Sequence, residues 1–209
     1  MYADVIIPIA YLAPVSYYSR LVACRNARME QWEHYVKQTY RNRCIIASES
    51  GPLALTVPVE KVMPGTLVRD VCVSDHGNWR HNHWQALMSA YDKTPYFEFY
   101  ADDFRPFYEK NYRFLFDYDE AMREMVCNLL NIRPVVFLTQ SYTSYPDAED
   151  CRMLFSPKSG ISDKRFVPTP YYQVFADRHG FLPNLSIVDL LFNMGPESIY
   201  VLRNSFLLQ

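Results

Sequence analysis

The stretch DVIIPIAYLAPVSYYSRLVAC, residues 4–24, decides how the fold is expected to begin. Residues 4–12 have the apolar density of a buried strand, and Pro8 predicts a break or an edge position within it. After Pro14 the apolar side chains recur at helical spacing, and Ser16 is placed to cap the helix that they predict. The chain is therefore expected to start with a strand followed by a helix.

The rest of the chain runs from strands through helices and back to a strand. Residues 43–60 predict two strands joined by a turn, residues 65–75 another strand, and residues 133–141 a buried strand. Helices are predicted from Asn78, over residues 94–112 with a break at Pro106, over residues 119–132, and from Ser186 with a restart after Pro196.

These elements predict an α/β or α+β fold, in which a mixed β-sheet from the N-terminal half packs against helices. With 209 residues the chain is expected to form a single domain over residues 1–209. Residues 141–172 show no periodicity and are rich in Ser, Asp and Pro. A loop of that length is usually functional or disordered, or it hides a misassigned element.

Composition argues against several classes of protein. A formal net charge of -2 disfavours a nucleic-acid partner, because such proteins usually carry a basic stripe. The apolar run at residues 5–15 follows Asp4 and contains two prolines, so neither a signal peptide nor membrane insertion is predicted, and the protein is expected in the cytoplasm. Five widely spaced cysteines without a CxxC pair favour reduced thiols. The 17 Tyr and 13 Phe suit a lined groove or an interface as well as a core.

The segment YVKQTYRNRC, residues 35–44, gathers three cations in a slightly negative chain. If the segment is extended, Lys37, Arg41 and Arg43 point the same way, and if it is helical, Lys37 and Arg41 still share a face. Phosphate or carboxylate is the natural ligand of such a face, and a basic, protected edge strand is the alternative. The residues predicted to bind an anion or substrate are Tyr35, Lys37, Tyr40, Arg41, Asn42 and Arg43.

Two residues are candidates for proton transfer. His81 and His83 form an HxH pair, but on a helix they lie about 200 degrees apart, so no metal is predicted. His83 is the better general base of the pair, and a hydrogen-bonded structural role is the alternative. Asp103, beside Asp102, is the second candidate, although adjacent acids commonly form a solvated helix face.

Common catalytic motifs are missing from the sequence. It holds no GxSxG, P-loop, GxGxxG or HExxH pattern, which leaves the corresponding hydrolase, NTPase, dinucleotide and metalloprotease mechanisms without support. No cofactor is predicted.

Longer stretches resemble the WbqC-like protein family, in the form typical of Bacteroidetes. They are IAYLAPVSYYSRL, EQWEHYVKQTYRNRC, GPLALTVPVE, HWQALMSAYDKTPYFEFY and YYQVFADRHGFLPNLSIVDLLFNMGPE. The resemblance implies a single WbqC-like domain encoded among genes for O-antigen or other surface polysaccharides, with a nucleotide sugar or another small glycan precursor as ligand. It carries over no catalytic residue.

Two classes of function follow. One is a transferase acting on a nucleotide-linked amino sugar by aminoacyl (glycyl) or acyl transfer, with the cations on the diphosphate and His83 or Asp103 taking the amine proton. Nucleotidyl transfer is a second enzyme version, for which a strand-turn-helix start is natural. The other class is a non-catalytic protein that binds or organises glycan precursors. The sequence leaves open whether the protein is an enzyme and whether it forms a homo-oligomer.

Overall fold

The structure is a computed structural model that describes residues 4–155 and 163–207. A four-stranded parallel sheet has the order β5-β2-β1-β6, and β3 pairs with β4 in a separate antiparallel hairpin. The strands are β1 (Asp4–Pro8), β2 (Asn26–Glu30), β3 (Arg43–Ser48), β4 (Gly51–Thr56), β5 (Val135–Leu138) and β6 (Ala148–Asp150). The mixed α/β class is confirmed, as is the hairpin predicted within residues 43–60.

Helices follow most of the predicted boundaries. They are α1 (Val15–Ala23), α2 (Trp79–Tyr91), α3 (Phe97–Phe104), α4 (Pro106–Glu109), α5 (Leu115–Leu129), α6 (Ala176–His179), α7 (Ile187–Met194) and α8 (Ser198–Asn204), with 3-10 turns η1 (Val68–Asp70) and η2 (Gly195–Glu197). Pro106 divides α3 from α4 as predicted, because its ring disrupts the preceding turn. Ser186 caps α7 by accepting a hydrogen bond from the Val188 N–H.

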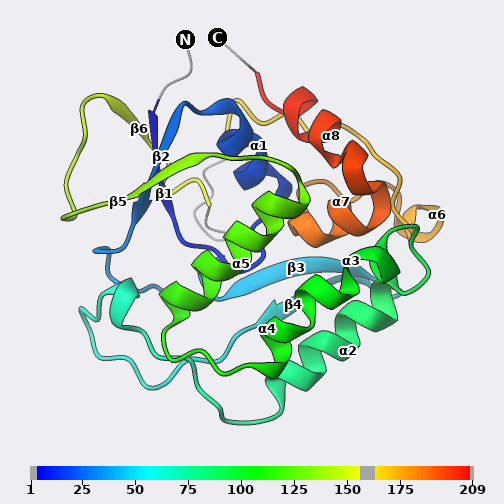
Figure 1. The fold of residues 1–209 in the computed structure, drawn as a ribbon, viewed down its shortest axis with the longest axis horizontal. Coiled ribbons are helices and arrows are strands. Elements are labelled where there is room, and N and C mark those ends of the chain that lie inside the picture. Colours follow the sequence, from blue (N-terminus) through cyan, green and yellow to red (C-terminus); the bar gives the residue numbers. More distant parts are fainter. Residues whose placement is uncertain (1–3, 156–162, 208–209) are drawn as a thin grey trace.

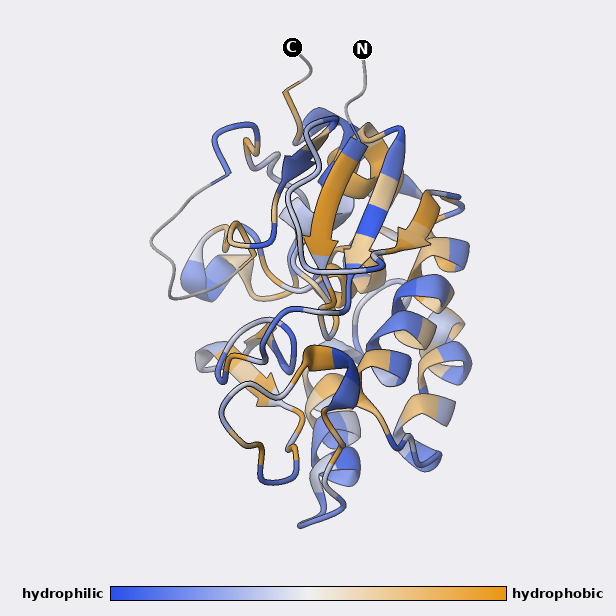
Figure 2. Cartoon of the chain, turned by 90° about the vertical axis from the view of Figure 1, so that its left-hand side faces the viewer, coloured by the Kyte–Doolittle hydropathy of each residue, from blue (hydrophilic) through white to orange (hydrophobic). Residues whose placement is uncertain are grey.

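The two faces of the parallel sheet are covered differently. Figure 1 shows α1, α7 and α8 on the right-hand side of the strands. The opposite face is turned toward the viewer in Figure 2, where no helix lies in front of the strands. The β5–β6 connection packs there, because the Arg28 guanidinium of β2 lies 4.7 Å from the centre of the Tyr145 ring and pairs with Asp147. A loop therefore covers the face that lacks helices.

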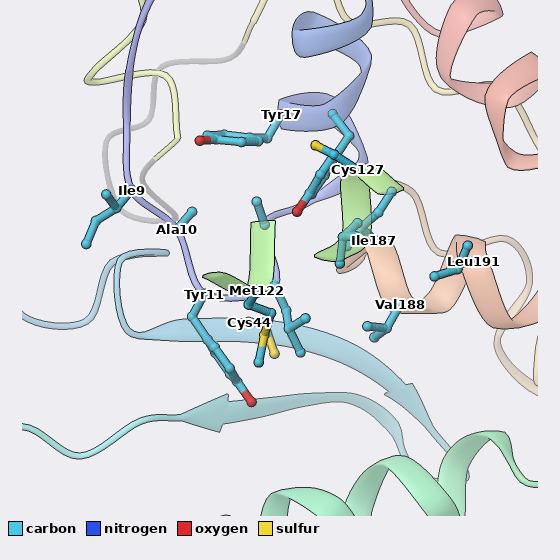
Figure 3. Close-up of a cluster of buried hydrophobic side chains, with 14 of the residues drawn as sticks. Ile9, Ala10, Tyr11, Tyr17, Cys44, Met122, Cys127, Ile187, Val188 and Leu191 are labelled. Carbon is cyan, nitrogen blue, oxygen red and sulfur yellow. The ribbon is translucent and has the colours of Figure 1, made fainter. Parts of the chain in front are cut away.

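The hydrophobic core lies where the sheet, the hairpin and the helices meet. In Figure 3, side chains from the chain after β1, from β3, from α5 and from α7 gather around one region. Tyr11, Cys44, Met122 and Val188 represent these four elements, and all are buried. The five cysteines are free thiols. Burial raises the pKa of Cys127 to about 11, as expected for an inert structural thiol.

Several local predictions differ from the structure. Residues 65–75 form η1 and isolated bridges in place of a strand, because their apolar side chains reach the core from an irregular backbone. Ser16 does not cap α1, since Pro14 occupies the N-cap position. The helix predicted over residues 119–132 begins earlier, at Leu115.

The strand predicted within residues 133–141 is present, but it is an exposed edge strand. Val135 is 49%, Phe137 55% and Leu138 45% exposed, because β5 pairs with β2 and with no other described strand. The segment 141–172, predicted as a loop, contains β6, and its residues 156–162 lie outside the described ranges. Within the described ranges, no helix combines the length and apolarity needed to cross a bilayer.

Candidate functional site at the carboxyl edge of the parallel sheet

The parallel strands bring their carboxyl ends to one edge of the sheet. Glu30 at the end of β2 pairs with Pro8, Leu138 pairs with Met29, and Asp150 pairs with Ile6. The strand order reverses beside β1, since β2 and β5 follow on one side and β6 returns on the other. Open α/β sheets bind ligands at such a carboxyl edge, where the order reverses. A functional site is therefore expected here.

A buried carboxylate joins the strand ends. Glu30 is fully buried, and its Oε1 accepts hydrogen bonds from the Trp32 backbone N–H at 2.7 Å and from Thr139 Oγ1 at 3.0 Å. Its Oε2 accepts from Nη1 of Arg152 at 2.9 Å. The Arg152 Nε also donates to Asp150 at 2.9 Å. This network fixes the ends of β2, β5 and β6 relative to one another.

A cavity of about 290 Å³ opens beside the network. It is lined by residues that follow β2, by part of the predicted basic segment and by residues on either side of β6: Trp32, Glu33, His34, Val36, Thr39, Arg41, Tyr142, Arg152 and Met153. Ligand cavities in proteins are usually of this size or larger. The cavity therefore suits one ring system or one sugar better than a complete nucleotide sugar.

Both arginines in the cavity wall have carboxylate partners. The Arg41 Nε donates to Glu33 Oε1 at 2.6 Å, and its Nη2 donates to Glu33 Oε2. Burial raises the pKa of the Glu33 carboxyl, although the hydrogen bond from Arg41 acts in the opposite direction. Arg152 pairs with Glu30 and Asp150, and its hydrogen bond lowers the pKa of Asp150. The buried charges of the wall thus largely neutralise one another.

Two aromatic side chains complete the wall. Trp32 is held in place because its Nε1–H donates to the Thr139 carbonyl at 2.9 Å, and the Arg69 guanidinium lies 4.5 Å from the ring centre. The Arg152 guanidinium lies 4.1 Å from the centre of the Tyr142 ring. Cation–π contacts of this kind orient an aromatic ring and still leave its other face accessible.

The predicted basic segment enters the site through a tight turn. Its first half is neither extended nor helical, because Gln38 has a φ of 63° and the Thr39 hydroxyl donates to the Val36 carbonyl at 2.9 Å. Lys37 lies at the tip of this turn and is exposed, between the cavity residues Val36 and Thr39. The three cations therefore do not share one face: Arg41 lines the cavity, whereas Lys37 lies in the turn between two of its lining residues.

The other residues predicted to bind ligand do not line the cavity. The Arg43 Nε donates to Thr56 Oγ1 across the hairpin at 3.0 Å, and Asn42 Nδ2 donates to the Val57 carbonyl at 2.9 Å. Tyr35 and Tyr40 are half-buried, and burial is the largest cause that raises the pKa of Tyr35 to about 12. None of these four is among the residues that line the cavity.

The two predicted proton-transfer residues lie apart from the cavity and from each other. His83, on α2, is buried, and its Nδ1 is hydrogen-bonded to the Tyr11 hydroxyl at 2.9 Å. Burial lowers the pKa of His83 to about 4. Asp103 is exposed on α3. Catalysis by either residue remains a prediction.

Acid should destabilise the protein through His83. The folded-state pKa of about 4 lies below the ordinary value of 6.5, so the unfolded chain takes up a proton as the pH falls through 6.5 while the folded protein does not. This difference is expected to remove about 2 kcal/mol of stability between pH 7 and pH 5.

Urea unfolding of the wild type and His83→Gln at both pH values measures this effect. Buried Asp189, whose pKa burial raises to about 6, acts in the opposite direction, but its contribution cancels in the comparison of the two proteins. Equal pH dependence in both proteins would show that the His83 imidazole stays accessible to protons.

The N-terminus of α1 is already occupied. The Val15 N–H donates to the Leu185 carbonyl at 3.0 Å, and the Ser16 N–H donates to the Asn184 side chain at 2.9 Å. In dinucleotide-binding sheets the phosphate lies at the helix that follows the first strand. Here the backbone N–H groups at the start of α1 already donate to oxygen atoms of the protein, so they do not serve a phosphate.

Sequence reasoning missed much of the cavity wall. Trp32, Glu33 and His34 directly follow β2, whose weak alternation gave no clear strand signal. Tyr142 and Arg152 lie in the segment without periodicity. A usable signal was the cluster of polar and aromatic residues 30–35, which leads into the predicted basic segment. Among the described residues, no group of three His, Cys, Asp or Glu side chains is placed to hold a metal ion.

Comparison with known proteins identifies the family. A model of the WbqC-like protein family matches residues 10–159, a range that includes every residue lining the cavity. The chain therefore belongs to the WbqC-like protein family, as the resemblance predicted. It is also similar to a Mycobacterium tuberculosis H37Rv protein, "Uncharacterized protein Rv1507c", with 26% identity over 194 residues, covering 81% of this chain and 84% of that protein. No solved structure matches.

Proposed function

We propose that the protein binds a nucleotide-linked amino sugar at the carboxyl-edge cavity and transfers an acyl or aminoacyl group, such as glycyl, to the amine of the sugar. The observation that carries the proposal is the position of the cavity, at the edge where the strand order reverses beside β1. Aromatic side chains in the wall, with exposed Lys37 in the adjoining turn, suit a ligand that combines rings with phosphate. The implied setting in surface-polysaccharide synthesis supplies that ligand.

His34 is the side chain in the cavity best suited to move a proton. It lines the cavity and is exposed, so it can reach an amine held outside the interior, whereas His83 is buried elsewhere. In the proposed reaction the amine nitrogen attacks the carbonyl carbon of an activated acyl donor, the bond from that carbon to the leaving group breaks, and His34 takes the amine proton. General base catalysis of this kind contributes about 100-fold to 10,000-fold in rate.

A binding protein without chemistry is the second candidate. It is favoured by the pairing of Arg41 with Glu33 and of Arg152 with Glu30. An arginine that is already paired with a carboxylate stabilises the negative charge of a transition state less than an unpaired arginine does. Nucleotidyl transfer is less favoured, because the amides at the start of α1 already donate to the segment at residues 184–185.

Turnover by purified protein tests the transferase. A nucleotide-linked amino sugar and an activated amino acid or acyl thioester should give a sugar product whose mass increases by the acyl group. His34→Gln is expected to lower turnover by at least about 100-fold with little change in sugar-nucleotide affinity. His76→Gln, an exposed histidine away from the cavity, is the matched control.

Two further variants decide between His34 and the residues predicted from the sequence. Loss of turnover in His83→Gln or Asp103→Asn, but not in His34→Gln, would return the proton-transfer role to the predicted residue. Binding of the sugar nucleotide with no product from any donor class would leave the protein as a binding protein.

A further inference from the structure

The cavity has little net positive charge with which to hold a phosphate. Each arginine that touches its wall has a carboxylate within 4.0 Å: Arg41 has Glu33, Arg152 has Glu30 and Asp150, and Arg69 has Asp70. A phosphate that entered would face these carboxylates as well as the guanidinium groups. An uncharged group is therefore the better occupant of the interior.

The rim of the cavity is apolar and aromatic. Val36 is 54%, Tyr142 58% and Met153 59% exposed, and all three line the cavity. Arg152 covers one face of the Tyr142 ring, which leaves the second face for a ligand, and Trp32 is fixed by its hydrogen bond to Thr139. A planar ring can stack on such side chains whatever its hydrogen-bonding pattern.

Lys37 offers a different kind of contact in the turn that borders the cavity. It is exposed at the tip of the Val36–Thr39 turn, and it makes no ion pair with any described residue. A lysine ammonium is a compact charge that suits phosphate. The charge that a phosphate needs therefore lies outside the cavity.

We infer that the site is divided, with the uncharged base of a nucleotide stacked inside the cavity on Tyr142 and Trp32 and its phosphates held outside by Lys37. This division rests on the proposed function, which supplies a nucleotide-linked ligand. It assigns the base of that ligand to the cavity interior and its phosphates to Lys37. It also revises the predicted role of Arg41, which holds the wall of the cavity through Glu33 and leaves the phosphate contact to Lys37.

Calorimetric titration tests the division with uridine, guanosine, their diphosphates, inorganic pyrophosphate and a nucleotide-linked amino sugar. At least one nucleoside should bind, its diphosphate should bind several-fold more tightly, and pyrophosphate alone should not bind. Tyr142→Ala should weaken nucleoside binding about tenfold, whereas Tyr200→Ala, at a similarly exposed tyrosine on α8, should not. Lys37→Gln should remove the advantage of the diphosphate and leave nucleoside affinity unchanged, with Lys110→Gln as control.

The outcomes separate this inference from the proposed function. Pyrophosphate binding as tight as that of the diphosphate, unchanged nucleoside affinity in Tyr142→Ala, or no nucleoside binding would each overturn the division. If the amino-sugar nucleotide still binds in any of those cases, the proposed function stands without it. If nucleosides bind as expected and no amino-sugar nucleotide binds, the division stands and the proposed function fails.

Discussion

Replacing Arg41 with Gln is expected to destabilise the protein by about 3 kcal/mol. The substitution leaves Glu33 without its guanidinium partner in a site where both side chains are buried. Removing one partner of a buried ion pair costs about 3–5 kcal/mol, because the remaining charge is neither paired nor hydrated. Urea unfolding at pH 7, with the slope checked for constancy, measures the loss.

Two other variants show whether the pairing is responsible. Glu33→Gln/Arg41→Gln removes both charges, so it should cost less than the sum of the single substitutions. Arg43→Gln loses a hydrogen bond to Thr56 at the edge of the hairpin and should cost about 1 kcal/mol. An Arg41→Gln protein as stable as the wild type would mean that Glu33 keeps access to water or to another donor.

Replacing Gly195 with Ala should have an effect of similar size, about 3 kcal/mol. Gly195 follows α7 with a φ of 53° and a ψ of -129°, a conformation that a residue with a Cβ adopts only with strain. A Cβ at this position would also lie 2.5 Å from the ring of Tyr96. Strain and overpacking both act against the folded state, so the thermal midpoint should fall by several degrees.

Gly65→Ala is the matched control for this substitution. Gly65 also has a positive φ, 83°, but a Cβ added there would meet no other atom within 4 Å. Only the backbone strain remains at Gly65, so the loss should be about 1 kcal/mol. Equal losses in the two variants would show that the Tyr96 ring moves aside at no cost.

Local signals explain which parts of the fold could be predicted. The first strand and helix, the hairpin and the capped helix α7 each combine an apolar pattern with a turn or cap within a few residues. The strands β2 and β6 are short and polar, with sequences NARME and AED. They form strands because each pairs with β1, which lies between them. Pairing with another strand cannot be recognised from the local sequence.

The same limit applies to the site. The density of positive charge in residues 35–44 pointed to the right segment, in which Arg41 lines the cavity and Lys37 lies between two residues that line it. The ion pairs in the cavity wall could not be predicted. Glu33 contacts Arg41 because the turn between them brings the two together, and Arg152 and Glu30 are 122 positions apart in sequence. Ion pairs formed by the tertiary fold turned an apparent cationic face into a nearly neutral wall.

The occupied start of α1 has a consequence for how the chain folds during synthesis. The contacts that close this helix terminus join residues 168 and 174 positions apart, from Ser16 to Asn184 and from Leu12 to Ser186. Contacts between residues so far apart in sequence slow folding. They also leave apolar surface near the N-terminus exposed until the C-terminal segments are made. The start of α1 therefore lacks these partners on the ribosome until the segment that leads into α7 emerges. A fragment limited to the family-matched residues 10–159 would lack both β1 and the segment that closes the start of α1.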